Sequence, residues 1–265
     1  MTKKTGQNPQ SGPDASLDEI AGMVQDALPE MPPVTKGGDL LGKYKDVWRW
    51  LAAAQYGATP AISRPRIALF TAMHGAFPEE QAEMSGLTEQ LGAGDHALCA
   101  LAQESNADLQ VYELNVDTAP RDFQKEPALL PHEAGHAASY GLMAVQPGID
   151  LLVLAALNPV AAKTGEKIIA GLKAKKDPFD TLSRFGGLDI AAMTGAIIAA
   201  RLAHIPVLLD GAAALAAAGI VQALRNDAAA HTRSAADILQ DKMHPQAGMT
   251  GALLVPFLKS LAKAG

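Results

Sequence analysis

The chain has 265 residues, a formal net charge of −6 and a single cysteine. Its length suits one sizeable domain, or one domain with a small helical annex, and its alanine-rich composition with only 5% aromatic residues favours close-packed helices over a β sandwich. The scattered basic residues exclude a nucleic-acid footprint, and we expect neither a secretory signal nor a membrane span. One thiol, Cys99, excludes a disulfide framework and indicates a reducing cytoplasm, with Cys99 buried as a small apolar residue.

The N-terminal part of the chain predicts a tail followed by helices. Residues 1–15 are polar and are expected to be disordered. Ser16 and Glu19 predict a capping box, and the helix after it carries one apolar face made by Leu17, Ile20, Val24 and Leu28. A second amphipathic helix is expected over 43–56.

Short apolar runs then alternate with helical stretches, which predicts parallel strands joined by crossover helices. The expected strands are 66–70, 109–114, 149–154 and 205–209, and the expected helices are 87–102, 133–145, one that ends at 173, 190–202 and 212–224. This order predicts a three-layer α/β fold, a mostly parallel Rossmann-like sheet with helices on both faces. We assign 16–60 to a helical segment that packs with the C-terminal helices, and 61–265 to the α/β domain. Residues 117–131 are expected to form a polar surface loop.

Polar residues follow the carboxyl ends of two expected strands, where open α/β sheets bind their ligands. His74 and Gly75 follow the first strand, and Asp210 with Gly211 follows the fourth. His74 alone would be read as an ordinary turn histidine, but this position gives a functional interpretation equal weight. A small-residue strip at 194–196 also offers a place where another backbone could approach closely.

A metal site is not expected. His132 and His136 are spaced i, i+4, so they could form a metal-binding pair. No carboxylate or cysteine cluster completes such a site, and a solvated helix face is the preferred interpretation. We expect no metal and no cofactor.

The most specific pattern in the chain lies between residues 186 and 211. It reads GGLDIAAMTGAI over 186–197 and PVLLDG over 206–211. This resembles the nicotinate-nucleotide:dimethylbenzimidazole phosphoribosyltransferase family, which has Gly-Gly-x-Glu-Ile-Ala-Ala-x-x-Gly-Ala-Ile and Pro-Val-x-Leu-Asp-Gly at these places. The resemblance extends from about Lys36 to Lys259 and includes a matching DPFDTL stretch at 177–182.

The resemblance implies that a benzimidazole-type base attacks the ribose C1 of nicotinate mononucleotide, so that nicotinate leaves and α-ribazole phosphate forms. It also implies a homodimer. Asp189, in place of the family's Glu at the helix start, and His74 are the candidate catalytic residues. The residues that match family positions and are expected to bind substrate are His74, Gly75, Gly186, Gly187, Asp189, Asp210, Gly211, His231, Gly248, Thr250 and Gly251.

The phosphate-binding turn of the family is altered in this chain. After the third strand the family carries a glycine-rich turn that cradles the nucleotide phosphate, together with a Glu that approaches the reacting centre. Here Ala156 takes the place of that Glu, and Pro159 and Val160 are unsuited to a tight phosphate turn. Lys163 and Thr164 are the substitute phosphate candidates, although an ordinary exposed helix start is the favoured interpretation.

Two further family residues lack a direct counterpart. The family's proposed general base, a Glu near the C-terminus, falls in 243–253, which has no carboxylate. The family's Gln that reaches the base has its nearest counterparts in Gln81 and Glu83. Two hypotheses therefore stay open: a divergent phosphoribosyltransferase, or a catalytically impaired paralogue that acts as a ligand-binding or regulatory subunit.

Overall fold

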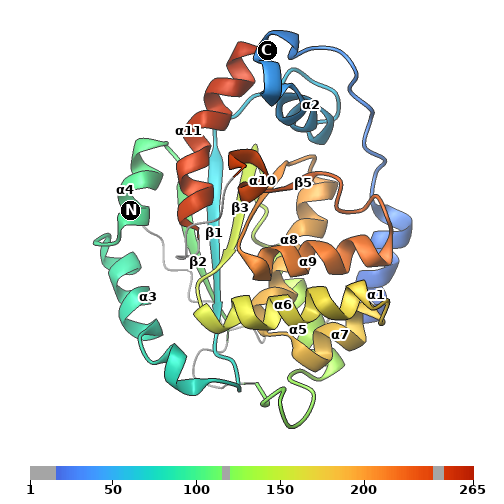
Figure 1. Cartoon of the computed structure of the whole chain (residues 1–265), viewed down its shortest axis with the longest axis vertical. Coiled ribbons are helices and arrows are strands. Elements are labelled where there is room, and N and C mark those ends of the chain that lie inside the picture. Colours follow the sequence, from blue (N-terminus) through green and yellow to red (C-terminus); the bar gives the residue numbers. More distant parts are fainter. Residues whose placement is uncertain (1–15, 115–119, 241–247) are drawn as a thin grey trace.

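The structure is a computed structural model that describes residues 16–114, 120–240 and 248–265. Its centre is a five-stranded, all-parallel sheet with the strand order β2-β1-β3-β4-β5 (Figure 1). The strands are Pro65–Ala72 (β1), Asp108–Leu114 (β2), Leu151–Ala156 (β3), Val207–Asp210 (β4) and Thr232–Ser234 (β5). After β1 the chain continues to β2 on one side of the sheet, and after β3 it continues to β4 and β5 on the other side. The place between β1 and β3 is therefore the topological switch point.

Helices cover both faces of the sheet, as the three-layer prediction requires (Figure 1). One face carries α1 (Leu17–Gly22), the π-helical turn η2 (Met23–Ala27), α5 (Pro131–Leu142), α6 (Pro159–Lys173), α7 (Pro178–Phe185), α8 (Leu188–Leu202) and α9 (Ala212–Leu224). The other face carries α2 (Lys45–Ala54), α3 (Met84–Ala93), α4 (Ala97–Glu104), α10 (Ala235–Leu239) and α11 (Met249–Ala264). The described residues also form two 3₁₀ turns, η3 (Asp39–Tyr44) and η4 (Pro78–Gln81). None of these helices has the length and apolar character needed to cross a bilayer.

The central strands are buried on both faces, so their side chains alternate between two separate cores. In β1, Ile67 and Leu69 belong to the core under α11, whereas Ala68 and Phe70 belong to the core under α8. The same alternation in β4 directs Leu209 toward the α8 side and places the next residue, Asp210, toward α11. The sheet therefore presents a polar side chain to α11 at its carboxyl edge.

The N-terminal helices divide between the two faces. The capping box is confirmed, because the Ser16 hydroxyl accepts from the Glu19 N–H and the Glu19 carboxylate accepts from the Ser16 N–H. The apolar face of this region packs into the core under α8, with α1 in contact with α5. In contrast, α2 lies against α11 on the opposite side of the sheet. The tail predicted for 1–15 lies outside the described residues.

Three local expectations were wrong. The single helix expected over 87–102 is two helices, because Gly94 has φ of +87° and ends α3, and the His96 side chain accepts from the Leu98 N–H to start α4. The described part of the expected polar surface loop, 120–130, places apolar side chains in the core: Phe123, Ala128 and Leu129. Cys99 is half-buried rather than buried, with its thiol 3.6 Å from the Leu91 carbonyl oxygen.

The small-residue strip of α8 is used for packing within the chain. A Cβ placed on Gly195 would lie 1.8 Å from the Ala138 carbonyl oxygen of α5. In the same way, a Cβ on Gly141 of α5 would lie 1.7 Å from the Ala192 carbonyl oxygen of α8. The two helices therefore cross with their backbones in direct contact, which only glycine permits at these positions.

Candidate functional site

A cavity of about 780 Å³ opens at the carboxyl ends of β3 and β4. This volume is typical of small-molecule sites, and the place is the one where open α/β sheets bind ligands. The residues that line it come from the η4–α3 segment, from the β3–α6 turn and from the β4–α9 turn, and include Glu80, Glu83, Met84, Leu87, Leu157, Asn158, Asp210, Gly211 and Ala212. Two of the residues expected to bind substrate, Asp210 and Gly211, are among them.

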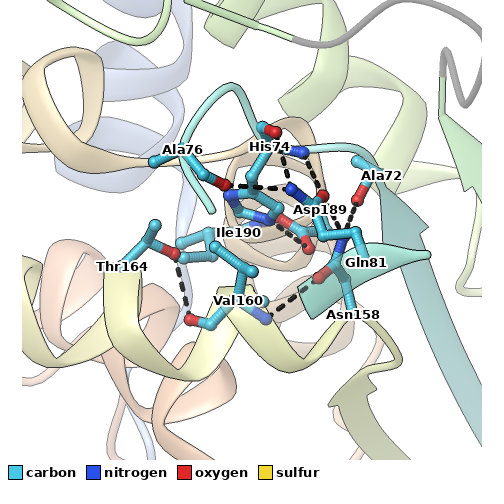
Figure 2. Close-up of polar contacts among 10 residues, drawn as sticks. Ala72, His74, Ala76, Gln81, Asn158, Val160, Thr164, Asp189 and Ile190 are labelled. Carbon is cyan, nitrogen blue, oxygen red and sulfur yellow. Dashed lines mark hydrogen bonds and ion pairs between the residues drawn. The ribbon is translucent and has the colours of Figure 1, made fainter. Parts of the chain in front are cut away.

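The turn that follows β1 is held from the inside by Gln81 (Figure 2). The Gln81 amide nitrogen donates to the carbonyl oxygens of His74, at 2.8 Å, and Ala76, at 2.9 Å. Its amide oxygen accepts from the His74 N–H at 2.7 Å. Since Gln81 is buried and its amide is fully engaged, it fixes the position of His74 and does not face the cavity.

A second buried amide, Asn158, joins the ends of β1 and β3 across the switch point (Figure 2). Its side-chain nitrogen donates to the Ala72 carbonyl oxygen and to the Gln81 amide oxygen, both at 2.7 Å. Its side-chain oxygen accepts from the Val160 N–H at 2.9 Å and so caps α6. The two amides together form one hydrogen-bonded network beneath the cavity.

Because of this cap, the first turn of α6 offers little to an anion. Pro159 has no N–H, the Val160 N–H is bonded to the Asn158 side chain, and the Ala161 N–H is bonded to the Asn158 carbonyl oxygen at 3.0 Å. A phosphate turn needs free backbone N–H groups at the helix start. The structure therefore agrees with the sequence that this turn lacks the features of a glycine-rich phosphate-binding turn.

The two candidate catalytic residues are brought together, but inside the protein. His74 Nε2 lies 3.1 Å from Asp189 Oδ2, and neither residue is more than 3% exposed. The other carboxylate oxygen of Asp189 accepts from the Ile190 N–H at 2.8 Å, at the start of α8 where the helix dipole favours a negative charge. A Cβ on Gly187 would lie 2.3 Å from the His74 ring, so glycine is required beside the pair.

Asp210 fastens the start of α11 to the end of β4. Its Oδ2 accepts from the Gly251 N–H at 2.7 Å, and Asp210 is buried. Gly248 has φ of +82°, and a Cβ on Gly251 would lie 2.3 Å from a methyl group of Val153. Thr250, between these glycines, is also buried. These expected substrate-binding residues thus meet at one edge of the sheet.

Two other glycines from the expected set allow close packing of the backbone. A Cβ on Gly75 would lie 2.1 Å from the Pro120 carbonyl oxygen, and one on Gly186 would lie 2.5 Å from the Leu182 carbonyl oxygen. Both positions therefore exclude any larger residue, Gly75 because of the neighbouring segment at Pro120 and Gly186 because of the end of α7.

The two phosphate candidates differ in accessibility. Thr164 is fully buried, and its hydroxyl donates to the Ala161 carbonyl oxygen at 3.0 Å within α6, so it is not placed to meet a ligand. Lys163 is exposed, pairs with Glu80 of the cavity wall, and holds its Nζ 4.5 Å from the centre of the Phe77 ring. Of the two, Lys163 is the residue that a ligand can reach.

His231 lies at the wrong end of the sheet for a substrate-binding residue. It precedes β5, and its carbonyl oxygen accepts from the Val207 N–H at the amino end of β4. Its ring is fully buried, with Nε2 3.0 Å from the Ile197 carbonyl oxygen. Burial, together with the charge of Arg201, lowers the pKa of His231 to about 3. The expected role is corrected: His231 is a neutral core residue.

This buried histidine predicts a specific sensitivity to acid. Between the native pKa of about 3 and the ordinary histidine pKa of 6.5, the unfolded state binds a proton that the native state does not. We expect His231 to lower the free energy of unfolding by about 1.4 kcal/mol per pH unit as the pH falls from about 6 to about 4. Urea unfolding across this range should give a shallower pH dependence for His231→Gln than for the wild type. Exposed His132→Gln serves as the control, and equal slopes for His231→Gln and the wild type would contradict the assignment.

The structural roles of Gln81 and Asn158 were not predicted from the sequence. An Asn followed by Pro is a common start of a helix, so the Asn158 cap had a readable signal. The buried hydrogen bonds of Gln81 had no readable signal, because they depend on how the turn after β1 folds back.

Among the described residues, no group of His, Cys, Asp and Glu could hold a metal ion, and His132 and His136 lie on an exposed helix face.

Known proteins match most of this chain. A family model described as phosphoribosyltransferase matches residues 20–164 and 160–247. Two relatives are named nicotinate-nucleotide–dimethylbenzimidazole phosphoribosyltransferase: one from Agrobacterium fabrum is 31% identical over 75% of this chain and 69% of its own, and one from Rhizobium leguminosarum bv. trifolii is 32% identical over 83% and 75%.

The fold agrees with a solved structure of the same name. The enzyme from Thermus thermophilus matches with a TM-score of 0.72 and 20% identity, over 92% of this chain and 93% of that one. The predicted α/β fold with helices on both faces of a parallel sheet is therefore confirmed. The chain belongs to the phosphoribosyltransferase family that includes the nicotinate-nucleotide–dimethylbenzimidazole phosphoribosyltransferases.

Proposed function

We propose that this protein transfers the phosphoribosyl group of nicotinate mononucleotide to a benzimidazole-type base, giving α-ribazole phosphate and nicotinate. The observation that supports this activity is the cavity beside the switch point, which has the volume of a small-molecule site in a chain of this family. A homodimer in the cytoplasm is part of the same proposal.

The proposed transfer depends mainly on how the two substrates are positioned relative to each other. Holding two substrates in a reactive geometry can supply a large share of the acceleration, and this needs a rigid wall. The network of Gln81 and Asn158 and the pair of His74 and Asp189 provide that rigidity beneath the cavity. In this proposal His74 and Asp189 act as positioning residues, since both are buried.

Residues at the cavity surface and mouth are proposed to contact the substrates. Asp210 and Gly211 line the cavity at the end of β4, next to the start of α11. Lys163, exposed on the first turns of α6, is proposed to contribute the positive charge for the phosphate in place of a backbone cradle. Its pairing with Glu80 keeps its side chain at the cavity wall.

The test is a calorimetric titration of the purified protein with nicotinate mononucleotide, with dimethylbenzimidazole, and with both, followed by an assay for α-ribazole phosphate. We expect binding of each ligand and product only when both are present. Binding of one ligand without product would contradict the proposed activity and identify a ligand-binding subunit. Absence of both heat and product would contradict it as well.

A further inference from the structure

Three carboxylate side chains line the cavity, and two of them are already engaged. Glu80 pairs with Lys163, and Asp210 accepts from the Gly251 N–H at 2.7 Å. Glu83 is exposed, and within 16–114, 120–240 and 248–265 its carboxylate has no hydrogen-bond or ion-pair partner. It is therefore the cavity carboxylate that is available to a ligand.

The position of Glu83 is fixed by the start of α3. Its carbonyl oxygen accepts from the Leu87 N–H at 3.1 Å, and Met84 and Leu87 next to it also line the cavity. The side-chain amide of Gln81, two residues earlier, is hydrogen-bonded to the turn after β1 and is therefore not available to a ligand. Of Gln81 and Glu83, the two candidates from the sequence for contact with the base, only Glu83 thus lines the cavity with an available side chain.

We propose that the Glu83 carboxylate accepts the proton that the benzimidazole base loses during the transfer, a role that rests on the proposed function. The lone pair of the base's unprotonated ring nitrogen forms the new bond to ribose C1. The bond from C1 to the pyridinium nitrogen breaks, and its electron pair stays on the departing nicotinate. The other ring nitrogen of the base then gives its N–H proton to a Glu83 oxygen.

This assignment supplies the carboxylate that the chain lacks elsewhere. Ala156 stands at the end of β3, and no Asp or Glu occurs in 243–253. A well-placed proton acceptor contributes about 10²–10⁴-fold to a rate. Glu83 brings one to the cavity from the η4–α3 segment, and the turns that follow β3 and β4 line the same cavity.

Kinetics of Glu83→Gln test the inference, with Glu89→Gln as the matched control. Glu89 lies on α3, the helix that begins just after Glu83, is exposed and does not line the cavity. We expect Glu83→Gln to lower kcat by about 10²-fold or more, with little change in KM for dimethylbenzimidazole. The fall in kcat that we expect for the wild type toward acidic pH should be absent from Glu83→Gln. Glu89→Gln should match the wild type in kcat, KM and pH profile.

Chemical rescue separates proton transfer from a purely structural effect. Glu83→Ala leaves room in the cavity, so added formate should restore part of its kcat, whereas Glu83→Gln should not respond. A Glu83→Gln variant with kcat within about 3-fold of the wild type overturns the inference but leaves the proposed function standing. A higher KM with unchanged kcat, or no rescue by formate, also overturns it. A wild-type protein that forms no α-ribazole phosphate overturns both.

Discussion

Gly195→Ala is expected to lower the free energy of unfolding by about 3 kcal/mol, the upper part of the usual range for an overpacked core. The added Cβ would sit 1.8 Å from the Ala138 carbonyl oxygen, which is backbone and cannot rotate away. Relief requires α5 and α8 to move apart, and this opens gaps along the most extensive helix contact among the described residues. Urea unfolding of the variant and the wild type measures the difference.

Gly92→Ala is the matched control for this prediction. Gly92 lies inside α3, and a Cβ there would have no neighbour within 4 Å. Alanine should therefore raise the free energy of unfolding by about 0.5–1 kcal/mol, because it restricts the unfolded chain and favours the helix. A Gly195→Ala variant as stable as the wild type would mean that α5 and α8 do not cross in direct backbone contact.

Asp189→Ala is expected to lower the free energy of unfolding by about 3 kcal/mol and to reduce product formation strongly. It leaves His74 Nε2 buried without its partner at 3.1 Å and removes the acceptor of the Ile190 N–H at the start of α8. The turn after β1 then loses one of its supports beside the cavity. Urea unfolding and the α-ribazole phosphate assay measure the two effects.

A double-mutant cycle isolates the contribution of the pair. We expect His74→Ala to be destabilising as well, and the double variant to be more stable than the sum of the single effects predicts, by about 1–3 kcal/mol. Glu166→Ala, an exposed position on α6, should stay within about 0.5 kcal/mol of the wild type. Additive effects of the two single substitutions would show that His74 and Asp189 do not stabilise one another.

The elements that the sequence predicted well are those that carry their own periodic signal. The apolar runs of β1, β3 and β4 lie in the sheet interior, and the expected helix 212–224 has the same bounds as α9. The break between α3 and α4 was missed although Gly94 marks it, because the apolar spacing continues on both sides. The burial of Phe123 depends on contacts with remote residues such as Phe77 and Phe185, which no local pattern encodes.

The sequence predicted only those site residues that lie at the carboxyl ends of strands. His74 comes just after β1 and Asp210 ends β4, so their place at the carboxyl edge follows from the parallel sheet alone. His231 was misplaced because its motif resembles the family while its burial depends on α8 packing behind it. The contact of Asp210 with Gly251 spans 41 residues and could not be read from spacing.

The buried amides of Gln81 and Asn158 also govern how the cavity wall exchanges hydrogen with water. The N–H groups of His74 and Val160 bond to these side chains instead of to a strand or helix partner. Each can exchange only when the shared network opens, which also frees the Ala72 carbonyl oxygen at the end of β1. The turn after β1 is therefore protected together with the sheet, and it does not fray as an independent loop.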